Sequence, residues 1–155
     1  MNKIKAILVD DEESARDVLE NLLIRTSNEI EIIGKSNGVI DAVEKIKEFQ
    51  PDVVFLDVQM PNYAGYEIVN FFSQINFEII FVTAYDQYAI KAFELSAIDY
   101  LVKPINRLRL QEAVEKLALK LKQTDALASY QNLYQTIKDK EFGTIIISEL
   151  GQKKI

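Results

Sequence analysis

The chain has 155 residues and 48% of them are hydrophobic, enough to form the core of one ordinary domain with additional material left over. It contains no cysteine and no histidine, which excludes disulfides, thiol catalysis, Cys-ligated zinc and any Ser-His or Cys-His nucleophile pair. A net charge of −6 argues against a nucleic-acid-binding surface made by these residues.

The first residues lead directly into a predicted strand, with no apolar signal-peptide region before it. No apolar run approaches the roughly 20 residues that a membrane-spanning helix requires. The lack of cysteine also fits a reducing compartment. We therefore expect a cytoplasmic protein that makes no contact with a membrane.

Five short apolar runs, rich in Ile, Val, Leu and Phe, show little alternation between polar and apolar residues. This pattern is typical of parallel strands that are covered on both faces. Segments with helical periodicity separate the runs, so the order is strand, helix, strand throughout. The sequence predicts an α/β fold, a doubly wound five-stranded parallel sheet with the flavodoxin-like strand order 2-1-3-4-5. The predicted strands are residues 4–9, 30–34, 53–56, 79–82 and 98–102.

Four amphipathic segments are predicted to be the helices between these strands. Each carries apolar residues at helical spacing, so that one face can cover the sheet. The second of them ends before Pro51, and the third begins after Gly65. The apolar positions are Ala15, Val18, Leu19, Leu22 and Leu23; Ala42, Val43 and Ile46; Ile68, Val69 and Phe72; and Ala89, Ala92 and Phe93.

From about residue 106 the pattern predicts an extended C-terminal helix of roughly nine turns. A first apolar stripe suits the core-facing side of a domain helix, and a second suits a linker or a dimer contact. The spacing between the stripes is six residues, which argues against one continuous coiled-coil seam. The first stripe is Leu110, Val114, Leu117 and Leu121, and the second is Leu127, Tyr130, Tyr134 and Ile137.

The segment Thr144–Ser148 is predicted to be a strand, followed by a turn and the start of another strand. Two strands alone do not form a stable domain, so the chain is expected to stop inside a second domain. The predicted organisation is a sheet domain at 1–123, a helical linker at 124–143 and the start of a truncated output domain at 144–155.

Polar residues directly follow four of the predicted strands. Asp10 and Asp11 follow the first, Asp57 the third, Thr83 the fourth and Lys103 the fifth. In the predicted sheet these ends converge at one edge, where ligands bind in open α/β folds. Such a cluster predicts a site at that edge.

Three carboxylates close together repel one another unless a cation lies among them. An all-oxygen site that keeps some water suits Mg²⁺, and Mn²⁺ is also plausible. We expect Asp11, Asp57 and the backbone carbonyl of Gln59 to be direct ligands, with Asp10 acting through water.

A carboxylate beside Mg²⁺ can attack phosphorus and form an aspartyl phosphate, so Asp57 is the candidate phosphoacceptor. Lys103 and the metal would neutralise the phosphoryl oxygens, and the Thr83 hydroxyl would donate a hydrogen bond. Without a histidine base the site is expected to accept and slowly release phosphate, which is not the activity of an ordinary enzyme.

These residues resemble the receiver domain of bacterial two-component response regulators. The resemblance covers residues 3–122 and rests on Asp10-Asp11, the segment from Asp57 to Pro61 with Gly65, Thr83-Ala84, Tyr100 and Lys103-Pro104. The segment 81–94 is most similar to receivers joined to LytTR-type DNA-binding domains, and the segment 144–155 resembles the start of such a domain.

The resemblance implies a role for each of these residues. Asp57 would accept the phosphoryl group, Asp10 and Asp11 would be the acid pair for Mg²⁺, and Lys103 would bind the phosphate. Thr83 and Tyr100 would be the switch pair, and the bond from Lys103 to Pro104 would be cis. Gln59 and Tyr85 occupy the variable positions of the family that flank the phosphate and tune its lifetime.

The resemblance also implies partners. A sensor histidine kinase would supply the phosphohistidine that this chain lacks. A homodimer would form through the face made by the fourth helix, fifth strand and fifth helix, or through the C-terminal helix. DNA would be bound only by the output domain that these residues do not contain.

Three alternative functions share part of this pattern. A haloacid-dehalogenase-type phosphatase requires a second Asp two residues after the nucleophile, where this chain has Gln59. A flavodoxin-like binding module requires a Ser/Thr/Gly-rich phosphate loop after the first strand, where this chain has the acidic segment 10–13. A phosphorylation-independent receiver that serves as a protein-interaction module is the third, although the complete acid set argues against it.

Overall fold

The computed structural model describes residues 2–149, with the side chains of residues 2–139. The chain divides into two compact units, residues 1–118 and 119–155. The first unit contains the sheet, its covering helices and the first turns of the last helix. Among the described residues no helix is both long and apolar enough to cross a membrane.

The sheet has five parallel strands in the order β2-β1-β3-β4-β5, which confirms the predicted topology. All four strand pairs are parallel, and one register shift lies between Ala6 and Ile7 where β1 pairs with β2. The strands are β1 (Ile4–Val9), β2 (Ile30–Ser36), β3 (Val53–Leu56), β4 (Glu78–Thr83) and β5 (Asp99–Val102).

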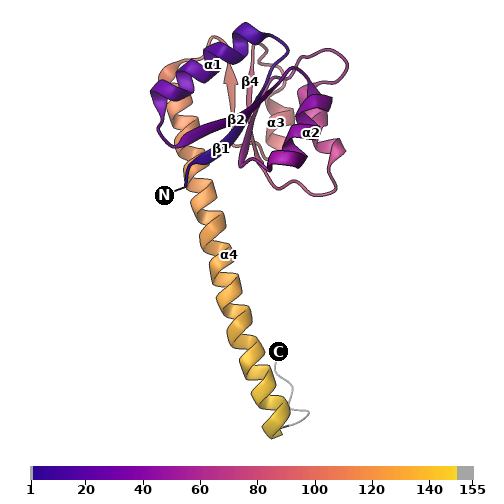
Figure 1. The fold of residues 1–155 in the computed structure, drawn as a ribbon, viewed down its shortest axis with the longest axis vertical. Coiled ribbons are helices and arrows are strands. Elements are labelled where there is room, and N and C mark those ends of the chain that lie inside the picture. The colour runs from indigo at the N-terminus through magenta and orange to yellow at the C-terminus, as the bar shows by residue number, and fades with distance from the viewer. Residues whose placement is uncertain (1, 150–155) are drawn as a thin grey trace. The chain divides into compact units, whose positions relative to one another are not determined.

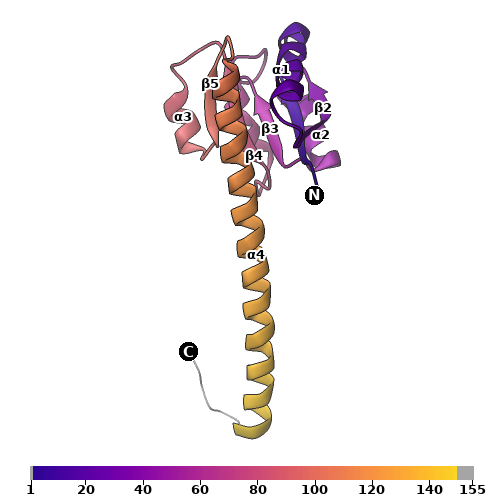
Figure 2. The same cartoon turned by 90° about the vertical axis from the view of Figure 1, so that its left-hand side faces the viewer.

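Helices cover both faces of the sheet (Figures 1 and 2). The α1 helix and the first turns of α4 lie on one face, and α2, η1 and α3 lie on the other. The helices are α1 (Glu13–Thr26), α2 (Val39–Phe49), the 3-10 helix η1 (Gly65–Phe71), α3 (Ala89–Glu94) and α4 (Arg107–Glu149).

The core consists of two layers because successive strand residues point to opposite faces of the sheet. Ile7 and Val9 of β1 pack into the cluster under α2 and η1, together with Leu56 and Phe81. The other face includes Leu8 and Phe55, which are also fully buried. Three residues of the first apolar stripe of α4, Leu110, Val114 and Leu117, are buried with the neighbouring Ala113, while Leu121 is only partly buried.

One of the four helices predicted between strands is a 3-10 helix rather than an α-helix. The seven residues of η1 include β-branched and aromatic side chains, which have modest helix propensity. Its end is tightened by a hydrogen bond from the Phe72 N–H to the Val69 carbonyl, three residues back. At its start the Ala64 N–H donates to the Glu67 carboxylate at 2.7 Å.

The strand predicted at Thr144–Ser148 is wrong, because the structure places these residues in α4, which ends at Glu149. A strand needs a neighbouring strand for its backbone hydrogen bonds, whereas a helix satisfies them within the segment. The β-branched residues here favour a strand only weakly. Residues 150–155 lie outside the described residues, and the predicted output-domain start at 144–155 remains a prediction.

Candidate functional site

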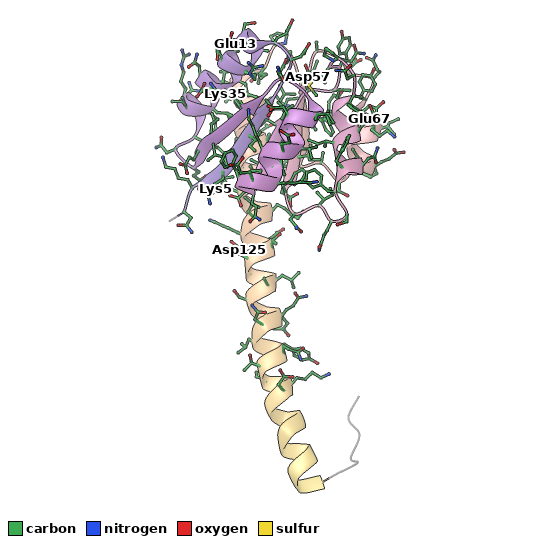
Figure 3. All side chains as sticks on the ribbon, turned by 45° about the vertical axis from the view of Figure 1, so that its right-hand side comes forward. Lys5, Glu13, Lys35, Asp57, Glu67 and Asp125 are labelled. Atoms are coloured by element: carbon green, nitrogen blue, oxygen red, sulfur yellow. The ribbon has the colours of Figure 1, made fainter. Side chains whose placement is uncertain are left out.

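Three aspartates meet at the edge of the sheet where the strands end. Asp10 directly follows β1 and Asp57 directly follows β3, and each is only 7% exposed, while Asp11 is exposed. One carboxylate oxygen of each lies within 4.8 Å of the other two. Figure 3 shows Asp57 at the opposite end of the sheet from Lys5 in β1. The predicted convergence of the acidic residues is therefore present.

Lys103 brings a positive charge to the two buried aspartates. Its Nζ lies 2.6 Å from Asp10 Oδ2 and 3.4 Å from Asp57 Oδ2. The lysine directly follows β5, and its N–H donates to the Thr83 carbonyl at 2.7 Å, so the neighbouring strand fixes its backbone. The peptide bond between Lys103 and Pro104 is cis, as the family resemblance implied.

Backbone contacts fix the direction of both buried carboxylates. Asp57 Oδ1 accepts a hydrogen bond from the Val58 N–H at 2.7 Å, and Asp10 Oδ1 accepts one from the Glu12 N–H at 2.9 Å. The Asp10 carbonyl accepts a hydrogen bond from Arg16 Nη1 at 2.7 Å. In each carboxylate the backbone binds Oδ1, and Oδ2 accepts a hydrogen bond from Lys103.

Gly65 is required by the close approach of η1 to the loop after β3. A Cβ placed on Gly65 would lie 1.8 Å from the Asp57 carbonyl oxygen, a distance that no side chain can adopt. The Gly65 N–H donates to the Val58 carbonyl at 2.7 Å, which closes the loop against the helix. A glycine here allows the backbone that carries Asp57 to pack directly against η1.

The electrostatics of the site oppose full ionisation of Asp57. Burial raises the pKa of the Asp57 carboxyl, and the neighbouring Asp10 charge adds to the shift. The hydrogen bond from Thr83 and the charge of Lys103 act in the opposite direction but are outweighed. Burial by itself would lower the pKa of Lys103, yet its hydrogen bond to Asp10 and the charges of Asp57 and Asp10 raise it.

The two predicted switch residues are connected through one residue, Tyr85. Thr83 is fully buried, and its Oγ1 accepts a hydrogen bond from the Tyr85 N–H at 3.4 Å. The Tyr100 hydroxyl donates to the Tyr85 carbonyl. Thr83 and Tyr100 thus bond to the two backbone polar groups of the same residue.

The residues present fit a divalent metal of the Mg²⁺ class. The cluster supplies three carboxylates and one ammonium, so a net negative charge remains to be balanced at partly buried oxygens. Hard oxygen ligands of this kind suit Mg²⁺ or Mn²⁺. The identity of the metal, and the part of the Gln59 carbonyl in binding it, remain predictions.

The chain belongs to the response regulator receiver domain family, whose model matches residues 6–115. The strand order, the acid cluster and Lys103 described above agree with that assignment. The phosphorylation of Asp57 is not itself shown by this membership.

Curated relatives include LytT-type and BtsR-type regulators. The chain is 45% identical over 115 residues to the sensory transduction protein LytT of Bacillus cereus, covering 73% of this chain and 46% of LytT. It is 44% identical over 115 residues to the transcriptional regulatory protein BtsR of Salmonella typhi, covering 74% of this chain and 48% of BtsR. The chain thus spans about half the length of these relatives.

Solved structures show the same fold. The response regulatory domain of mrkE from Klebsiella pneumoniae matches with a TM-score of 0.70 at 32% identity, covering 77% of this chain and 99% of that one. The receiver domain of AraT from Geobacillus stearothermophilus matches with a TM-score of 0.70 at 29% identity, covering 79% and 98%.

The sequence did not predict several contacts that shape the site. They include the bond from Arg16 to the Asp10 carbonyl and the bond from Gln59 Nε2 to the Tyr88 hydroxyl at 2.8 Å. The position of Arg16 in the first turn after the acid pair is a weak local signal. No sequence signal connects Gln59 to Tyr88, because these residues come from loops after different strands.

Proposed function

We propose that this chain is a phosphorylation-activated receiver in which Asp57 accepts a phosphoryl group from the phosphohistidine of a sensor kinase. The observation that carries the proposal is the set of Asp10, Asp11, Asp57 and Lys103 at one edge of the sheet. The proposed reaction would take place in the cytoplasm. The chain is a signalling phosphoacceptor and not an enzyme that turns over a substrate.

In the proposed step an Asp57 carboxylate oxygen attacks phosphorus while the phosphorus–nitrogen bond to the donor imidazole breaks. The imidazole leaves with the electron pair and takes a proton from solvent. Lys103 lies 3.4 Å from Asp57 Oδ2, so its ammonium is placed to pair with the new phosphoryl oxygens. Mg²⁺, held by Asp11, Asp57 and the Gln59 carbonyl with Asp10 acting through water, would supply further charge neutralisation.

Thr83 and Tyr100 then transmit the change. The Thr83 hydroxyl would turn to donate to a phosphoryl oxygen and would give up its bond from the Tyr85 N–H. Because the Tyr85 carbonyl holds the Tyr100 hydroxyl, this movement would free Tyr100 to change its position. Support for this route lies in the two hydrogen bonds that Tyr85 makes in the unphosphorylated structure.

The output would be a homodimer that controls transcription. Ile90 and Phe93 of α3 are 75% and 85% exposed, and Val102 of β5 and Leu108 of α4 are also exposed. The second unit separately exposes Leu127, Tyr130, Tyr134 and Ile137. Either surface could make the dimer, and the BtsR relative is by name a transcriptional regulator. DNA would be bound by an output domain beyond these residues.

The test is to incubate the 155-residue chain with acetyl phosphate and Mg²⁺ and to measure its intact mass. We expect one added phosphoryl group, no addition to Asp57→Asn, and no addition when a chelator removes the metal. Asp125→Asn, which removes an exposed carboxylate of α4, is the matched control and should be labelled like the parent. Full labelling of Asp57→Asn would show that Asp57 is not the acceptor.

A phosphorylation-independent receiver is the second candidate. It would acquire no label under these conditions and would dimerise equally with and without acetyl phosphate. The near-complete burial of Asp10 and Asp57 beside Lys103 argues against it, because such a charged cluster is costly to keep without a use.

A further inference from the structure

A hydrogen bond between two loops lies beside the acid cluster. Gln59 follows Asp57 by two residues, and its Nε2 donates to the Tyr88 hydroxyl at 2.8 Å. Tyr88 comes from the loop after β4 and directly precedes α3. The bond therefore connects the loop that carries the phosphoacceptor with the start of another helix.

Ring contacts and a backbone bond hold the Tyr88 hydroxyl in place. Its ring centroid lies 6.0 Å from that of Tyr66 and 6.5 Å from that of Tyr85, and its carbonyl accepts the Ala92 N–H at 3.1 Å. The hydroxyl is thus a fixed acceptor, whereas Gln59 is an exposed side chain with several rotamers of similar energy. The hydrogen bond selects among those rotamers.

Gln59 and Tyr88 line the same open groove as Asp11. The groove has a volume of about 470 Å³ and also includes Met60, Pro61 and Asn62. The groove meets the acid cluster at Asp11, which is exposed and has a carboxylate oxygen within 4.8 Å of one of the buried Asp57. A Gln59 side chain held across this groove would restrict the approach of water.

We propose that Tyr88 is a positioning residue for the aspartyl phosphate: by holding the Gln59 amide across the groove, it slows hydrolysis of the phosphoryl group on Asp57. This inference rests on the proposed function. In the hydrolysis a water oxygen bonds to phosphorus while the bond from phosphorus to the Asp57 oxygen breaks. The carboxylate leaves with the electron pair, and the water's two protons leave with the phosphate as dihydrogen phosphate.

The variant Tyr88→Phe removes the hydroxyl and retains the ring contacts with Tyr66 and Tyr85. We expect it to acquire the label as the parent does and to lose it roughly threefold faster, the size of effect that one exposed neutral hydrogen bond produces. Tyr66→Phe is the matched control. It removes a hydroxyl from the same ring cluster that has no hydrogen bond to any described residue, so its decay rate should equal that of the parent.

The experiment labels the 155-residue chain with acetyl phosphate and Mg²⁺, removes the donor by desalting, and follows the labelled fraction by intact mass. The decisive comparison adds Gln59→Met and the double variant Gln59→Met with Tyr88→Phe. If Tyr88 acts through Gln59, its substitution accelerates decay in the parent and has no further effect when the amide is absent.

An unchanged or slower decay in Tyr88→Phe overturns the inference, and so does an equal acceleration in the Gln59→Met background. These results leave the proposed function standing, because they are measured on a label that has formed. Failure of the parent to acquire any label overturns the proposed function and the inference together. A melting temperature equal to that of the parent confirms that Tyr88→Phe is folded.

Discussion

Replacing Asp57 by asparagine should stabilise the protein when no divalent metal is bound. The carboxylate oxygens of Asp10, Asp11 and Asp57 lie within 4.8 Å of one another, so each pair repels by roughly 3.5 kcal/mol or more at an effective dielectric constant of about 20. Lys103 at 3.4 Å attracts Asp57 by roughly 5 kcal/mol on the same scale. Because Asp11 is exposed, water screens its repulsion of Asp57. The remaining repulsion and the cost of burying the Asp57 charge exceed the attraction to Lys103. Together they favour the neutral side chain by about 1–2 kcal/mol.

The assay is thermal unfolding in the presence of a chelator. For a domain of this size we expect the melting temperature of Asp57→Asn to exceed that of the parent by about 4–8 °C. Adding Mg²⁺ should raise the melting temperature of the parent by binding linkage and raise that of the variant much less. Asp11→Asn should also stabilise the metal-free protein, by a smaller amount.

The control for Asp57→Asn is Glu115→Gln, which removes one exposed negative charge of α4 far along the chain from the cluster. Mg²⁺ should raise the melting temperature of this variant as much as that of the parent. If Asp57→Asn and Asp11→Asn both melted at a lower temperature than the parent in chelator, repulsion among the three acids would not destabilise the folded protein.

Three further predictions follow from other contacts. Gly65→Ala places a Cβ 1.8 Å from the Asp57 carbonyl, so it should lower the free energy of unfolding in urea by about 3 kcal/mol and abolish labelling by acetyl phosphate. Asp99→Asn breaks the ion pairs to Arg109 at 3.0 Å and Lys116 at 3.1 Å and should cost about 1–3 kcal/mol at neutral pH, measured in the same way. A version ending at Gln123 should sediment as a monomer at a high concentration at which the 155-residue chain sediments as a dimer, if the second unit supplies the dimer contact.

The Asp99 prediction carries a defined pH dependence. Burial would raise the pKa of Asp99, but its bonds to Arg109, the Tyr100 N–H and Lys116 outweigh this and lower it. A lowered folded-state pKa gives stability that is fully present above the unfolded value of about 3.9 and is lost as the pH falls through the folded value. The stability difference between the parent and Asp99→Asn should therefore be constant from neutral pH to about pH 5 and shrink below pH 4.

Contradictory results for these variants are easily recognised. Normal labelling of Gly65→Ala would mean that the loop after β3 can move away from η1. A stability difference for Asp99→Asn that grew on acidification would reverse the assigned sign of its pKa shift. A 155-residue chain that is as monomeric as the version ending at Gln123 would exclude the second unit as the dimer contact.

The sequence by itself determined the topology and the membership of the acid cluster. Short apolar runs without alternation, separated by segments of helical periodicity, predict parallel strands covered on both faces, and polar residues that follow such strands meet at one edge of the sheet. Asp10, Asp57, Thr83 and Lys103 were located on this ground alone. The local order of residues decides these features, because a strand and the residue after it are adjacent in the chain.

Only the tertiary structure decided which partners the side chains choose. The Lys103–Asp10 contact, the Gln59–Tyr88 bond and the bond from Tyr100 to Tyr85 each join segments that are separated in the sequence. The tertiary structure also decided the conformation of Thr144–Ser148. Its β-branched sequence suits a strand, but the structure places it in α4. The periodicity of apolar residues predicts which face of a segment is buried, but not which segment packs against it. Contacts between segments depend on packing and on the backbone hydrogen bonds that must be satisfied.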